Sequence, residues 1–209
     1  MARALFSFAV AGMLLGLISD VSAQEKNELT GLIGRTIVSD HGVTDTSTPG
    51  ALLTSGPGLS FEVNYGRRLM DLGLVGLTGE VPFVVNVNEK VGYNLNLVPK
   101  DYKSFFVTPS LRANLFPATG ISPWVSVGGG FGYFKENSSL EFGGANPGET
   151  GTATGIFQIG AGLDIRLFSR LSLRGEARDF YSGVPTLNVD IGKSRQHNIF
   201  VGAGVVWHF

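Results

Sequence analysis

Three histidines are the side chains of this sequence best suited to acid–base chemistry near neutral pH. His41 follows Asp40, His197 lies two residues after Arg195, and His208 is the penultimate residue. A hydrolase would need one of them beside a serine nucleophile, at a fixed spacing on neighbouring elements. The sequence contains no such motif and no ligand spacing typical of a metal site. We therefore expect no catalytic residue, no metal, no cofactor and no enzymatic activity.

A second set of reactive side chains consists of acids and arginines at alternate positions of several stretches. In one stretch Glu62 shares its parity with Ser60 and Asn64, opposite Phe61 and Val63. Residues of one parity lie on one face of a strand, so these charges would face a common interior. The predicted members are Glu62, Glu80, Arg112, Asp164, Arg174, Glu176 and Arg178. They fit an ion path or a salt-bridge network that fills a narrow interior, and we favour the network.

Composition narrows the class of protein. The chain has 209 residues, with 30 glycines, 15 phenylalanines and no cysteine, and 16% of its residues are charged. Typical soluble domains have roughly 25% charged residues. The lack of cysteine excludes disulfides and zinc–thiolate sites. The formal net charge of −1 gives no basic footprint, so we expect no nucleic-acid partner.

The first 23 residues predict a cleaved secretory signal peptide. Arg3 supplies a positive start, residues 4–18 are apolar, and Val21-Ser22-Ala23 has the small residues of a cleavage site. We expect residues 24–209 to form the mature domain. No later apolar run reaches the ~20 residues of a spanning helix, so this domain would enter a membrane only as strands.

The mature chain divides into eight runs of alternating polarity. They lie at 28–38, 59–69, 74–86, 104–116, 124–135, 154–167, 171–181 and 197–209. Connections after the second, fourth and sixth runs are short, and the others are long and polar. This asymmetry is typical of membrane barrels with apolar side chains outside and polar side chains inside. We therefore predict an all-β fold, an eight-stranded antiparallel up-and-down transmembrane β-barrel.

The first run leaves its facing open. Leu29, Leu32 and Ile33 fall on both parities, and Arg35 alone hints which parity faces inward.

Two stretches complete the pattern, "SPWVSVGGGFGYF" at 122–134 and "VGAGVVWHF" at 201–209. With the eight runs they resemble the small eight-stranded outer-membrane barrels of the OmpA and OmpX type. The resemblance implies an integral, monomeric protein of the bacterial outer membrane, in contact with outer-membrane lipid and lipopolysaccharide. It also implies that Phe209 is part of the signal read by the barrel-assembly machinery. Trp207 and Phe209 would face lipid in an aromatic girdle.

We expect a structural or surface-interaction role carried by four long extracellular loops, above a lumen plugged by the charged network. An alternative is a narrow channel or hydrophobic-ligand port resembling OmpW, suggested by Phe106, Ile156 and Phe200 at inward positions of the outer strand halves. A lipid A-modifying enzyme, a class also found among small barrels, ranks third.

Deletion of Phe209 tests the predicted assembly signal. We expect less protein assembled in the outer membrane while synthesis stays unchanged, because the terminal aromatic residue would be missing from the recognised strand. Quantitative immunoblots of outer-membrane and whole-cell fractions measure both amounts. Equal assembled amounts for the truncated and full-length chains would contradict the assignment.

Overall fold

The computed structural model describes residues 26–38, 41–42, 52–56, 58–93, 96–189 and 192–209. The predicted signal peptide, residues 1–23, lies outside the described residues. The described part contains no helix that is long and apolar enough to cross a membrane.

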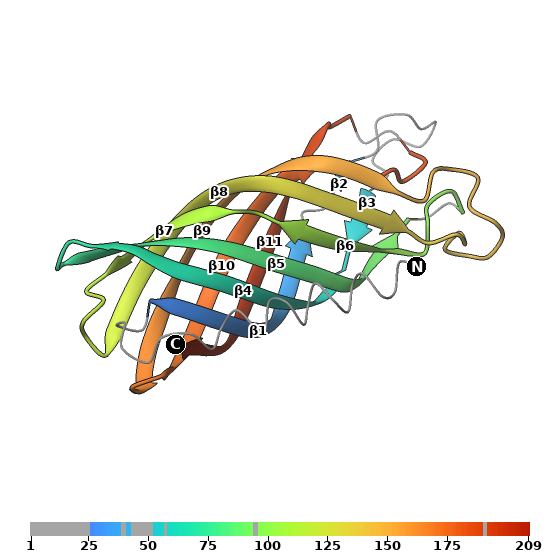
Figure 1. The fold of residues 1–209 in the computed structure, drawn as a ribbon. Coiled ribbons are helices and arrows are strands. Elements are labelled where there is room, and N and C mark those ends of the chain that lie inside the picture. The colour runs from blue at the N-terminus through green and yellow to red at the C-terminus, as the bar shows by residue number, and fades with distance from the viewer. Residues whose placement is uncertain (1–25, 39–40, 43–51, 57, 94–95, 190–191) are drawn as a thin grey trace, which may run out of the picture.

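The described chain is a ring of antiparallel strands, with two short extra strands in one connection (Figure 1). The strands are β1 (Asn27–Val38), β2 (His41–Gly42), β3 (Leu52–Ser55), β4 (Gly58–Asp71), β5 (Val75–Gly92), β6 (Asp101–Val107), β7 (Ser110–Leu115), β8 (Ile121–Glu136), β9 (Thr152–Phe168), β10 (Leu171–Gly183) and β11 (Arg195–His208). β6 and β7 form one wall position, because both pair with β5 and β8. The break between them contains Pro109, which has no N–H to donate to a ladder. The ring therefore has eight wall positions, as predicted.

The first and last strands close the sheet. β1 pairs with β11 from Glu28 opposite His208 to Val38 opposite Asn198. Beyond this ladder, the Asn27 N–H donates to the Phe209 carbonyl at 3.0 Å, and the Phe209 N–H donates to the Asn27 carbonyl at 2.9 Å. The seam is thus hydrogen-bonded to the last residue, and the ring has no open edge there.

The two ends of the barrel differ. Short turns join β4 to β5, β7 to β8 and β9 to β10 at one end, where the C-terminus also lies (Figure 1). In the first of these turns, Gly73 has a φ of 82° and its N–H donates to Asp71 Oδ1 at 2.9 Å. Longer connections lie at the opposite end (Figure 1). We refer to these as the short-turn end and the long-loop end.

Burial settles the facing of β1. Thr30, Leu32 and Thr36 are buried, while Ile33 and Arg35 are exposed. The hint that Arg35 faces inward was therefore wrong. Cross-strand partners share a face, and Arg35 pairs with Val201, an exposed apolar residue of β11.

The seam between β1 and β11 requires glycine at Gly34. A Cβ at Gly34 would lie 2.7 Å from the Gly202 Cα, and still closer to the Val201 carbonyl oxygen. Both contacts are backbone atoms, so no side-chain movement can relieve them. At Gly31 on the same strand, a Cβ would meet nothing within 4 Å.

We predict that Gly34→Ala lowers the free energy of unfolding by about 1–3 kcal/mol, the usual cost of overpacking, because the seam must open to admit the methyl group. Gly31→Ala is the matched control and should leave stability nearly unchanged. Urea titration of barrels refolded into lipid vesicles measures both. Equal midpoints for the two variants would show that the seam is not tightly closed at Gly34.

Candidate functional site

The half of the lumen near the short turns holds a connected set of buried ion pairs. Arg112 on β7 reaches two carboxylates, with Nη2 2.6 Å from Glu28 Oε1 and Nη1 3.0 Å from Glu80 Oε2. Arg174 on β10 contacts the same Glu28 oxygen at 3.1 Å and Asp164 Oδ1 at 2.7 Å. Glu28 therefore links the two guanidiniums, although they come from well-separated strands.

Arg178, also on β10 but nearer the long-loop end, extends the same network. Its Nη1 lies 2.8 Å from Glu80 Oε1, and its Nε forms an ion pair with Glu176. The same Nε lies 3.6 Å from Glu62 Oε2, and no hydrogen bond to either Glu62 carboxylate oxygen is found within the described structure. All these side chains are buried. The structure thus places the seven predicted charged residues in one network and adds Glu28.

Trp124 lies among the three arginines. The guanidinium carbons of Arg112, Arg174 and Arg178 are 5.5, 5.4 and 5.0 Å from its ring centre. These distances suit cation–π attraction. The indole Nε1 donates to Asp164 Oδ1 at 3.2 Å, so the ring is also held by a hydrogen bond.

Gly162 makes room for this ring. It is the cross-strand partner of Trp124 on β9, and a Cβ there would collide with the indole. The glycine-rich inner face therefore fits one large side chain directly opposite a very small one.

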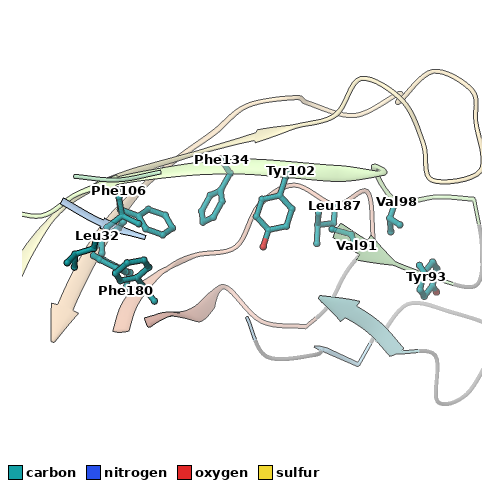
Figure 2. Close-up of a cluster of buried hydrophobic side chains, with 12 residues drawn as sticks. Leu32, Val91, Tyr93, Val98, Tyr102, Phe106, Phe134, Phe180 and Leu187 are labelled. Atoms are coloured by element: carbon teal, nitrogen blue, oxygen red, sulfur yellow. The ribbon is translucent and has the colours of Figure 1, made fainter. Parts of the chain in front are cut away.

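A second, apolar layer fills the lumen toward the long-loop end. The ring of Phe106 lies 5.1 Å from that of Phe180 and 5.8 Å from that of Phe134, and Phe134 packs edge-on against Tyr102. These rings form a column along the barrel (Figure 2). Its other members are Leu32, Val84, Val91, Tyr93, Val98, Ile156, Leu187 and Phe200. Because Val98 and Leu187 belong to long connections, the loops contribute directly to this layer.

The outer face is an apolar belt bounded by aromatic rings. Trp207 is 51% exposed at the short-turn end, and Tyr181 lies beside His197 at the other side of the belt. Trp207 and His197 are ten residues apart on β11. This separation is about 33 Å along the strand, or about 25 Å along the membrane normal for a strand tilted as in membrane barrels. Further exposed aromatic side chains of the outer face are Phe61, Phe83, Phe131 and Phe157. This belt has the height of the hydrocarbon core crossed by membrane barrels.

Solved structures share this architecture. Neisserial surface protein A superposes with a TM-score of 0.53 at 14% identity, with 88% of this chain and 97% of that chain covered. OprG from Pseudomonas aeruginosa gives a TM-score of 0.52 at 12% identity, with 91% and 99% covered. The N-terminal barrel domain of OprF from the same organism gives 0.51 at 12% identity, with 88% and 98% covered. The chain has the fold of the small outer-membrane β-barrels.

The sequence itself matches no protein-family profile and no curated protein. The fold class, the resemblance to small outer-membrane barrels and the outer-membrane location are nevertheless confirmed at the level of the fold. The short-turn end is accordingly the periplasmic end of the barrel, and the long-loop end is extracellular.

The histidines occupy different places in the barrel. His208 lies at the periplasmic mouth, where its Nε2 is 3.0 Å from Ser172 Oγ. His197 faces outward, with Nδ1 2.6 Å from Asp179 Oδ2. For His41 only the backbone in β2 is described. The described residues contain no group of three or more potential metal ligands.

The pair at the periplasmic mouth resembles a nucleophile with its base, but its surroundings do not fit catalysis. The cavity it lines has a volume of about 30 Å³, which leaves room for only a few water molecules. The nearby Glu28 carboxylate is bound to Arg112 and Arg174, so it is not free to orient His208.

Sequence reasoning missed two members of the lumen network. Glu28 shares its inward parity with Thr30 and Thr36, a signal that becomes readable once the facing of β1 is known. The parity of Trp124 already opposed that of Val125 and Val127, which places the indole inside, but parity does not reveal the arginines around it.

Removal of an arginine from the network should destabilise the barrel strongly. We predict that Arg178→Ala lowers the unfolding free energy by ~3–5 kcal/mol, because Glu176 is left buried without its cation and Glu80 keeps only Arg112. The exposed Lys193→Ala should change it by less than ~0.5 kcal/mol. The pair Arg178→Met and Glu176→Gln should recover part of the loss.

Urea unfolding in lipid vesicles measures all three proteins. If Arg178→Ala and Lys193→Ala unfold at the same urea concentration, the lumen charges are hydrated and do not act as a buried network.

Proposed function

We propose that this protein is a sealed, non-enzymatic, monomeric outer-membrane barrel whose role is structural or lies in surface interaction through its long extracellular loops. Its partners are outer-membrane lipid and lipopolysaccharide, together with the barrel-assembly machinery, for which Trp207 and Phe209 belong to the recognised strand. The observation that carries the proposal is the filling of the lumen by two successive layers, charged and then apolar.

The filling leaves little space for a solute. In the periplasmic half, three buried guanidiniums surround the Trp124 ring. In the outer half, Phe106, Phe180 and Phe200 are each 0% exposed. An ion on this path would have to displace paired charges and then cross a packed apolar layer, which is costly without compensating partners.

The alternative is a narrow channel or a port for hydrophobic ligands. It rested on Phe106, Ile156 and Phe200, which point inward as that alternative requires. These side chains pack in one cluster with the loop residues Val98 and Leu187. Packing of this kind favours a plug beneath the loops and argues against an open port.

The extracellular connections support a surface role because they are bound to one another. Asn188 donates from Nδ2 to the Leu97 carbonyl at 3.0 Å and to Asn146 Oδ1 at 2.7 Å. Asn96 donates to the Gly143 carbonyl at 2.9 Å. Three loops that are distant in sequence therefore form one connected surface, and Phe142 is 65% exposed on it. An ordered surface carried by a rigid barrel is a usual location for binding.

Conductance measurements test the sealed lumen. We predict that the purified wild-type barrel gives no stable single-channel steps in planar bilayers, because both lumen layers exclude a continuous water path. A porin inserted under identical conditions is the positive control, and heat-dependent gel mobility verifies that the barrel is folded. Reproducible steps from the wild-type barrel would refute the sealed lumen and favour the channel alternative.

A further inference from the structure

Two lysines face each other directly across neighbouring strands on the lipid-facing side of the barrel. Lys103 on β6 and Lys135 on β8 are cross-strand partners, and both side chains are exposed. Partners of this kind have Cβ atoms about 4.5–5.5 Å apart, and like charges at that separation are unfavourable. An anion between the two ammonium groups would offset this repulsion.

No such anion is found among the described residues of the chain. The three acids nearest in sequence form hydrogen bonds with neutral groups, and none of them forms an ion pair with either lysine. Asp101 Oδ1 accepts from Asn137 Nδ2 at 3.0 Å. Glu136 is buried inside the barrel and accepts from Thr152 Oγ1 at 3.1 Å. Glu141 Oε2 accepts from the Tyr93 N–H at 3.0 Å, and no ion pair of Lys103 or Lys135 is present in the described structure.

The position of the pair along the strands indicates where the anion comes from. Phe105 and Tyr133 are also cross-strand partners, and they lie two residues closer to the membrane on the same face. Their rings are 5.8 Å apart, and Phe131 lies 6.3 Å from Phe105. Aromatic rings of this kind mark the membrane interface. Two residues extend about 7 Å along a strand, so the ammonium groups lie at the level of the lipid head groups.

Two other lysines of the same rim provide a contrast. Lys90 and Lys100 line a polar cavity together with Asp101 and Glu141. Acids and lysines are balanced there in number, whereas no described acid forms an ion pair with Lys103 or Lys135. The excess of positive charge is therefore local and does not extend over the whole rim.

We propose that Lys103 and Lys135 form a binding site for a phosphate group of the outer-leaflet lipid, the phosphorylated lipid A of lipopolysaccharide. One phosphate bridges the two ammonium groups through charge-assisted hydrogen bonds. The Phe105, Phe131 and Tyr133 rings support the lipid beside it. The inference rests on the proposed lipopolysaccharide partner and assigns that partner to the rim formed by β6 and β8.

The test measures the affinity of the refolded chain, in uncharged detergent, for lipopolysaccharide with and without its lipid A phosphates. Native mass spectrometry counts the bound lipid. We expect Lys103→Gln/Lys135→Gln to weaken binding of the phosphorylated form roughly tenfold or more, as expected for the loss of contacts between charged partners. Lys103→Arg/Lys135→Arg should retain binding. The control Lys90→Gln/Lys100→Gln removes the same charge from the same rim and should have a much smaller effect.

Three results would overturn the site. The first is equal affinity of the wild type and the Lys103→Gln/Lys135→Gln variant for the phosphorylated lipid, as expected if the lysines only extend into water. The second is equal loss in the Lys90→Gln/Lys100→Gln control, which would indicate diffuse rim charge. The third is displacement of the lipid by inorganic phosphate at equal concentration, which would identify a site for the free ion.

The conductance of each variant is also measured, so that failure of the lipid site can be distinguished from failure of the sealed lumen. A barrel that conducts no ions but binds the phosphorylated lipid independently of the lysine pair would overturn this site alone. Conductance by the wild type would overturn the sealed lumen, whatever the lipid affinity.

Discussion

Hydrogen bonding of every backbone group inside a lipid bilayer is the constraint on which the rest of this structure depends. Lipid supplies no donors or acceptors, so a sheet that crosses it must close on itself. The seam between β1 and β11 meets this requirement through the mutual hydrogen bonds of Asn27 and Phe209. Once the ring is closed, each strand has one face toward lipid and one toward the lumen, and the alternation of the sequence follows from that geometry.

A ring of eight wall positions leaves an interior about as wide as its own side chains. Two layers of side chains fill this interior in different ways. Near the periplasm, five carboxylates meet three guanidiniums around one indole, and buried charges of this kind are tolerated only when they are paired. Near the loops, aromatic and aliphatic side chains fill most of the space. The polar layer gives specific directional contacts, and the apolar layer gives dense packing.

Much of this was predictable from the sequence, because parity along a strand is a local property. It gave the ring, the asymmetry of its ends and the inward position of Glu62, Glu80 and Arg178. It did not give the partner of each charge, because pairing depends on register and on distances across the lumen. Glu28 contacts arginines 84 and 146 residues away in sequence. The sequence also left open which face of β1 is inward, because its glycines and mixed apolar residues carry little parity signal. The parity of Arg35 suggested the opposite facing from the one observed.

The apolar layer also connects the lumen to the surface. Val98 and Leu187 reach into the cluster from two different loops, while Asn188, the residue after Leu187, is hydrogen-bonded to Leu97 and Asn146 at the surface. A loop that moved outward would therefore withdraw an apolar side chain from its packing and break hydrogen bonds to its neighbours. Both losses oppose the movement, because apolar exposure and unpaired polar groups each cost free energy. The barrel interior thus acts as the support that fixes the shape of the extracellular surface, and a filled lumen and an ordered loop surface are two aspects of one packing arrangement.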